Sequence, residues 1–157
     1  MEIATMMASC LASAAPPVAT AGYSRDIGEP MTTEAEQANE NLVNRFCQDW
    51  EKQDAELLTT YFAQPFEYMV WEGGPVITTN EEFIKQMGPF LTKLKSVDWV
   101  VLRSHAMGPM VVNERIDHFY AHDSKYDNHP HIAGMFLVRD GKIAVWRDYS
   151  MPKPEQG

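Results

Sequence analysis

The sequence predicts an α+β fold, in which N-terminal helices pack against a curved, mostly antiparallel sheet. Apolar residues recur with a period near 3.6 over residues 33–62 and again over 79–94, which is typical of amphipathic helices. From residue 96 onward the period changes to two, which is typical of strands with one buried face. Helices followed by long strands with short turns favour this class over an alternating βαβ order.

The first predicted helix begins with a capping box. Thr33 can accept a hydrogen bond from the amide three residues later, while the Glu36 side chain reaches back to the Thr33 amide. The apolar residues of one helix face are Leu42, Val43, Phe46, Cys47 and Trp50. Asp54 can cap a short second helix, and Pro65 prevents that helix from continuing.

A strand over 66–72 is expected next, followed by a glycine-rich turn and a short strand over 76–78. Thr79 and Glu82 form a second predicted capping box, so a third helix begins there. The dipeptide Gly88-Pro89 is expected to bend or interrupt this helix.

Four β-type runs complete the predicted domain and pair as an antiparallel sheet: residues 96–107, 110–121, 131–139 and 142–150. A strongly curved sheet wrapped over the helices leaves one open end, which is a natural pocket for a small molecule. We therefore expect a single domain over 32–151, between a weakly structured extension over 1–31 and a tail over 152–157.

The composition indicates one globular domain, because 45% of the 157 residues are hydrophobic and 22% are charged. The formal net charge of -9 repels phosphate and anionic lipid, so nucleic acid is not expected as a partner. No apolar stretch approaches the roughly 20 residues that cross a bilayer, so no membrane partner is expected either.

The cysteines and the N-terminus bear on the compartment. Only Cys10 and Cys47 are present, which encodes no disulfide framework and favours the cytoplasm. Ala19-Thr20-Ala21 has the pattern of a weak cleavage site, which leaves export open. Translation from Met31 is a further interpretation of this segment.

The candidate chemistry lies on the last strands. Period two places Asn113, Arg115, Asp117 and Phe119 on one face of their strand, and Ala144, Trp146 and Asp148 on one face of the last strand. The planar guanidinium of Arg115 has five donors, so it can bridge Asp117 and Asp148. Inside an apolar cavity one carboxylate can then hold a proton while the other stays charged. The alternative is an ordinary surface salt bridge between neighbouring strands.

Three segments carry a resemblance to a known family: Asn113-Glu114-Arg115-Ile116-Asp117, Gly134-Met135-Phe136, and the run from Asp140 to Tyr149. Together they closely resemble the limonene-1,2-epoxide hydrolases, within the nuclear-transport-factor-2-like (NTF2-like) and SnoaL-like superfamily. Tyr61-Phe62-Ala63 and Tyr68 also match in spacing, so the resemblance covers about residues 38 to 150. It implies a cone-shaped, NTF2-like or cystatin-like fold, and open sheets of this kind often pair face to face as homodimers.

The resemblance also implies a role for each matching residue. Asp148 would be the base that deprotonates a water, Asp117 the acid that protonates the epoxide oxygen, and Arg115 the bridge between them. Tyr68 would help to hold the water. The implied partners are a small, largely apolar epoxide and water, and such a push-pull reaction needs no metal or organic cofactor.

One position departs from the family pattern. The family has a water-holding Asn two residues after the tyrosine, where this chain has Val70, which can neither donate nor accept a hydrogen bond. Asn113 or Glu72 could substitute, or the pocket could serve an isomerase, a cyclase or a non-catalytic binding module. The residues predicted to contact the substrate are Val70, Asn113, Trp146, Phe119 and Met87.

Other polar and aromatic residues predict no further site. His118 and His122 fall on a strand and its turn rather than on a helix face, so no metal site is predicted. The four tryptophans, Trp50, Trp71, Trp99 and Trp146, are expected in the core or the pocket wall.

Overall fold

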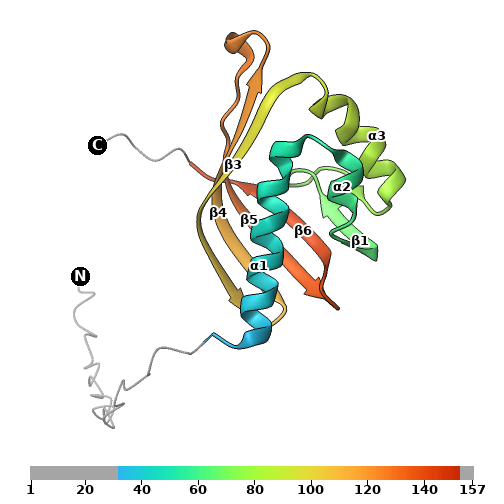
Figure 1. Ribbon diagram of the computed structural model, residues 1–157, viewed down its shortest axis with the longest axis vertical. Helices are drawn as coiled ribbons and strands as arrows, with labels where there is room; N and C mark the ends of the chain where they lie inside the picture. The colour runs from blue at the N-terminus through green and yellow to red at the C-terminus, as the bar shows by residue number, and fades with distance from the viewer. Residues whose placement is uncertain (1–31, 153–157) are drawn as a thin grey trace, which may run out of the picture. The chain divides into compact units, whose positions relative to one another are not determined.

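The computed structural model describes residues 32–152 (Figure 1). The helices are α1 (Glu34–Asp49), α2 (Ala55–Thr59) and α3 (Asn80–Leu91). The strands are β1 (Phe62–Met69), β2 (Val76–Ile77), β3 (Leu94–Met107), β4 (Met110–Ala121), β5 (His131–Arg139) and β6 (Lys142–Ser150). The predicted extension over 1–31 and residues 153–157 of the predicted tail lie outside the described residues. Within residues 32–152 no helix is both long and apolar enough to cross a membrane.

The sheet has six strands in the order β2-β1-β6-β5-β4-β3. Strands β3 to β6 form a continuous antiparallel series, and β2 pairs antiparallel with β1. Strand β1 runs parallel to β6, so the sheet is mixed. The predicted α+β class, with a curved and mostly antiparallel sheet, is confirmed.

The predicted bounds of β4, β5 and β6 agree with the structure, but those of β1 were wrong. The strand begins at Phe62 rather than residue 66, because Phe62 already pairs with Ile143 of β6. Pro65, which has no amide hydrogen to donate, lies in β1 where the register shifts between Phe62 and Glu67. The strand ends at Met69, so Val70 and Glu72 lie in the connection to β2.

The helix starts follow the predicted chemistry with one exception. At α1 the Thr33 hydroxyl accepts from the Glu36 amide at 3.2 Å, and the Glu36 carboxylate accepts from the Thr33 amide at 2.9 Å. At α3 Thr79 caps the Glu82 amide, but the Glu82 side chain accepts from Gln86 instead of completing the box. Helix α3 also continues through Pro89 to Leu91, because Pro89 lies close to the helix end and removes little of its hydrogen bonding.

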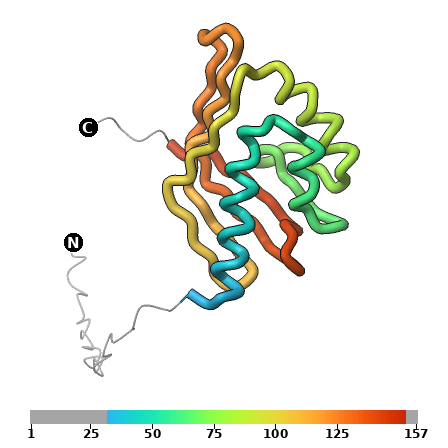
Figure 2. The backbone as a smooth tube through the Cα atoms, viewed as in Figure 1, coloured from blue at the N-terminus to red at the C-terminus, as the bar shows by residue number. Residues whose placement is uncertain are grey.

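Helix α1 crosses the concave face of the sheet, where the core lies (Figures 1 and 2). Its Phe46 side chain packs edge-on against Trp146, with ring centroids 5.0 Å apart, and against Trp99. Trp50 stacks on Trp99 with centroids 4.1 Å apart. These three tryptophans are buried as predicted, but Trp71 is 58% exposed in the turn after β1.

The inner face of β4 departs from this apolar pattern. Val111, Asn113, Arg115 and Asp117 are all buried there, although three of the four are polar. Buried charges are stable only when they are paired and hydrogen-bonded, so their partners define the site.

Candidate active site

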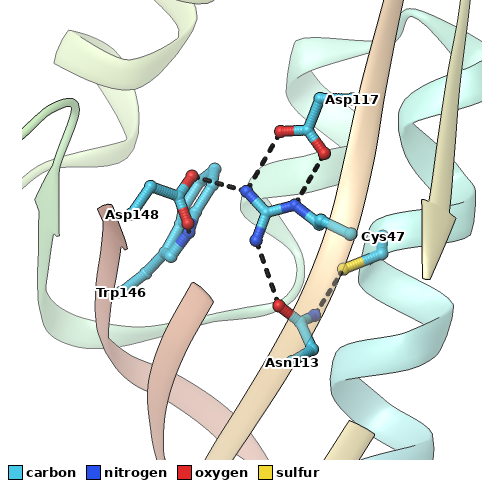
Figure 3. Close-up of polar contacts among 6 residues, drawn as sticks. Cys47, Asn113, Asp117, Trp146 and Asp148 are labelled. Atoms are coloured by element: carbon cyan, nitrogen blue, oxygen red, sulfur yellow. Dashed lines mark hydrogen bonds and ion pairs between the residues drawn. The ribbon is translucent and has the colours of Figure 1, made fainter. Parts of the chain in front are cut away.

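Arg115 is the centre of a buried charged cluster with Asp117 and Asp148 (Figure 3). Its Nε donates to Asp117 Oδ1 at 2.8 Å and its Nη2 to Asp117 Oδ2 at 3.2 Å. The same Nη2 donates to Asp148 Oδ2 at 2.6 Å. The guanidinium thus joins carboxylates on β4 and β6. The sequence predicted this connection from the alternation of side chains along each strand and from their charges.

The remaining contacts of Arg115 fix its position. Its Nη1 donates to Asn113 Oδ1 at 3.2 Å, and its Cζ lies 4.5 Å from the centroid of the Trp99 ring. Asn113 Nδ2 in turn lies 3.5 Å from Cys47 Sγ on α1. Cys47 was predicted only as part of an apolar helix face, since nothing in the sequence links it to β4.

Asp148 has a second support that involves the aromatic core. Trp146 Nε1 donates to Asp148 Oδ1 at 2.8 Å, so each carboxylate oxygen accepts one protein hydrogen bond. The Trp146 ring stacks on Tyr68, with centroids 3.7 Å apart and planes 9° from parallel. Trp146 therefore orients both Asp148 and the aromatic ring of the predicted water-binding Tyr68.

Burial determines the protonation of the site. Desolvation raises the pKa of Asp117 to about 7, although Arg115 opposes this shift. Burial also disfavours the charge on Arg115, but Asp148 and Asp117 outweigh it and raise its pKa, so the guanidinium stays charged. Burial, followed by the nearby Asp148 charge, raises the pKa of Tyr68, so this phenol keeps its proton.

The two carboxylates reach a cavity of about 280 Å³. Its walls are otherwise mainly aromatic and aliphatic, and none of the Lys and Arg residues that the structure describes lines it. The lining residues are Trp50, Tyr68, Val70, Met87, Phe90, Trp99, Asp117, Phe119, Pro130, Ile132 and Asp148. An apolar cavity with a few convergent polar groups is typical of a small-molecule site.

Two residues predicted to contact a substrate do not line this cavity. Asn113 lies behind Arg115, and both ends of its amide already have protein partners, Arg115 and Cys47. Trp146 is fully buried behind Tyr68 and Asp148. Their roles as substrate contacts stay predictions. The alternation of side chains along a strand distinguishes the two faces of a sheet but not the depth of a side chain.

Val70, Met87 and Phe119 do line the cavity, together with Tyr68. Neither proposed substitute for the family's Asn reaches it, because Asn113 is behind the wall and Glu72 is exposed in the turn after β1. Among residues 32–152 no amide side chain lines the cavity.

Sequence reasoning missed several cavity residues. Phe90 lies on the apolar face of α3, and Ile132 shares the inner face of β5 with Gly134 and Phe136, so periodicity could have identified both. Pro130 comes from the segment before β5, where no periodic pattern exists to find it.

The histidines form contacts of their own. His118 and His129 approach with their Nδ1 atoms 2.9 Å apart, and His131 Nε2 lies 2.8 Å from Glu114 Oε1. None of these residues lines the cavity. Within residues 32–152 no group of three or more His, Cys, Asp or Glu side chains is arranged to hold a metal ion.

The model of the SnoaL-like domain family matches residues 43–146, and the chain therefore belongs to that family. Among curated proteins, no sequence matches the chain significantly.

Solved structures share the fold at low sequence identity. An LEH-like epoxide hydrolase from M. tuberculosis is 20% identical with a TM-score of 0.65, covering 74% of this chain and 84% of that one. A protein from Catenulispora acidiphila with a ketosteroid isomerase-like fold, in complex with trimethylamine, is 18% identical with a TM-score of 0.61, covering 69% and 83%. A Jannaschia protein assigned as a SnoaL-like polyketide cyclase is 16% identical with a TM-score of 0.65, covering 75% and 88%. The predicted NTF2-like cone fold is confirmed, while the specific resemblance to limonene-1,2-epoxide hydrolases stays a prediction.

Proposed function

We propose that the protein hydrolyses a small, largely apolar epoxide to a vicinal diol in one push-pull step. The observation that carries this proposal is the single guanidinium of Arg115 bridging two carboxylates that both reach an apolar cavity. Opening a strained, neutral ring needs a base and an acid that act together, and it needs no cofactor.

In the proposed reaction Asp148 accepts a proton from water while the water oxygen bonds to an epoxide carbon. The carbon–oxygen bond of the ring breaks, and Asp117 donates its proton to the departing oxygen. The pKa of Asp117, raised to about 7 by burial, suits a group that must hold a proton near neutral pH. Transfer of the proton from Asp148 back to Asp117 restores the starting state.

Arg115 and Tyr68 support this division of roles. Arg115 holds both carboxylates in place and stabilises the charge that Asp117 acquires when it releases its proton. Tyr68, protonated and on the cavity wall, can donate a hydrogen bond to the attacking water. The aromatic and aliphatic walls favour an uncharged hydrocarbon skeleton over a phosphate or a carboxylate substrate.

The test is turnover of terpene and cycloalkene oxides in oxygen-18-labelled water. We expect a diol that carries one labelled oxygen, and we expect Asp148→Asn and Asp117→Asn each to lower kcat by about 100-fold to 10,000-fold. Asp98→Asn is the matched control, because Asp98 is exposed on β3 and does not line the cavity. A wild-type protein that opens no epoxide, or either site variant with full activity, would contradict the proposal.

A second candidate is an isomerase or cyclase in which one aspartate moves a proton on a steroid-like or polyketide-like substrate. Val70 favours it, because the cavity wall beside Tyr68 offers an aliphatic side chain instead of an amide for water. A product of unchanged mass without oxygen-18 would support this candidate, whereas a labelled diol would exclude it.

A non-catalytic binding module would be favoured by an exposed Arg115 and Asp117 with no cavity beside them. Both residues are instead buried, and Asp117 lines a cavity. The homodimer and the cytoplasmic location stay predictions.

A further inference from the structure

The charged cluster spans three strands of the sheet. Arg115 and Asp117 belong to β4 and Asp148 to β6, with β5 between them. Neighbouring strands lie about 4.8 Å apart, so β4 and β6 are separated by roughly 10 Å. The Arg115 guanidinium must therefore cross the inner face of β5 to reach Asp148.

Gly134 is the residue of β5 at this crossing. It pairs with Asn113 of β4 on one side and with Asp148 of β6 on the other. A Cβ atom at this position would lie 2.3 Å from Arg115 Nη1 and 2.5 Å from Asn113 Oδ1. Both distances are far below van der Waals contact, and Phe136 Cε2 would lie 2.9 Å away, so any side chain here would displace both polar groups and press on the Phe136 ring.

The displaced groups have little freedom to move. Arg115 is fully buried and holds hydrogen bonds to Asn113, Asp117 and Asp148. Asn113 is itself held at Cys47. The backbone of Gly134 does not adopt the left-handed conformation that favours glycine, so the close approach of the guanidinium is what requires the missing side chain.

We propose that Gly134 is a positioning residue, whose missing side chain opens the path by which Arg115 connects the carboxylates of β4 and β6. The contact with Asp117 stays within β4, whereas the contact with Asp148 depends on the path over β5. A side chain at residue 134 meets Nη1, which donates to Asn113, and so shifts the outer end of the guanidinium, whose Nη2 holds Asp148. The Nε contact with Asp117, closer to the β4 backbone, stays in place. The catalytic consequence rests on the proposed function, whereas the structural consequence does not.

The experiment compares Gly134→Ala with Gly88→Ala, a control in which the added Cβ meets no atom within 4 Å. The first readout is the nitrogen-15 NMR spectrum of the Arg115 guanidinium, which needs no substrate. In the wild type and the control we expect separate, slowly exchanging Nη1 and Nη2 signals, and in Gly134→Ala we expect these to broaden or merge. The second readout is turnover, where Gly134→Ala should lower kcat about 100-fold while KM stays within about threefold, because Gly134 does not line the cavity.

Retained Nη signals together with a kcat within about threefold of the wild type would overturn the proposal. A wild type that opens no epoxide would refute the proposed function, but the guanidinium signals would still decide the role of Gly134.

A double variant tests whether the guanidinium is the main group that the added Cβ displaces. Gly134→Ala should lower Tm by at least about 5 °C in the wild-type background and by less than half as much in the Arg115→Met background, which lacks the guanidinium. An equal loss in both backgrounds would show that Asn113 or Phe136, and not the guanidinium, requires glycine. Where Gly134→Ala alone does not fold, a double variant as stable as Arg115→Met supports the proposal, and a double variant that does not fold overturns it.

Discussion

Arg115 contacts two carboxylates, Asp117 at one end of its guanidinium and Asp148 at the other, and these two contacts form in different ways. At the Asp117 end, two hydrogen bonds join residues of the same strand, and the Asp117 side chain is 5% exposed. At the Asp148 end, one hydrogen bond crosses β5, Trp146 supplies a second donor, and the side chain is 12% exposed. The contact with Asp117 lies within one strand and is deeply buried, while the contact with Asp148 depends on the pairing of three strands.

In the proposed reaction, this difference would give two similar carboxylates two separate roles. Deep burial favours the neutral form of Asp117, which is what a general acid requires. Asp148 accepts hydrogen bonds from Arg115 and Trp146, which hold it at the cavity wall. In the proposed reaction, environment rather than residue type would distinguish the acid from the base.

The largest effect is expected from breaking both ends at once. Arg115→Met leaves the buried Asp117 and the partly buried Asp148 without their cation, so we expect a loss of about 3 to 5 kcal/mol in the free energy of unfolding. Activity should fall at least as far as in either aspartate variant. Denaturant unfolding and kcat measured on the same preparations check both expectations.

Arg115→Lys is the matched variant, which should break mainly the contact with Asp148. A lysine ammonium lacks the planar fork, so from residue 115 it can pair with Asp117 on its own strand but cannot also hold Asp148 across β5. We expect a smaller loss of stability than in Arg115→Met, with kcat still about 100-fold below the wild type. A lysine variant with full activity would show that charge alone, without bridging, is sufficient.

A smaller and more specific effect is expected from pH, which acts at the Asp117 end. The pKa of Asp117 is raised to about 7, so its proton is present below that pH and is lost above it. Because the acid must be protonated, kcat/KM should fall about tenfold for each pH unit above the pKa. The residual activity of Asp117→Asn should lack this alkaline limb, and an unchanged limb in that variant would assign it to another group.

The smallest effect is expected at the Asp148 end. Trp146→Phe removes the donor to Asp148 Oδ1 but keeps an aromatic ring beside Tyr68. Loss of one hydrogen bond to a charged group corresponds to about a tenfold decrease in kcat. The alkaline limb should stay in place, because the Asp117 end is untouched. Loss of that limb, as expected in Asp117→Asn, would mean that the Asp117 and Asp148 contacts are not separable.

Much of the fold was predictable from local patterns. The bounds of β4, β5 and β6 follow from period two and from turn residues, and the α1 start follows from Thr33 and Glu36. Strand β1 was placed too late in the chain, because its first residues are strand only through pairing with β6. The partner strand lies about eighty residues away, and pairing over that distance produces no hydrophobic periodicity in so short a segment.

Arg115 and Asp117 share one face of β4 for a local reason, because side-chain direction in a strand depends only on whether a residue number is odd or even. Asp148 completes the cluster through long-range structure, since that contact depends on strand order, on register and on the missing side chain of Gly134. Only the tertiary structure decided that Asn113 and Trp146 stand behind the cavity wall, because the alternation of side chains carries no information on depth.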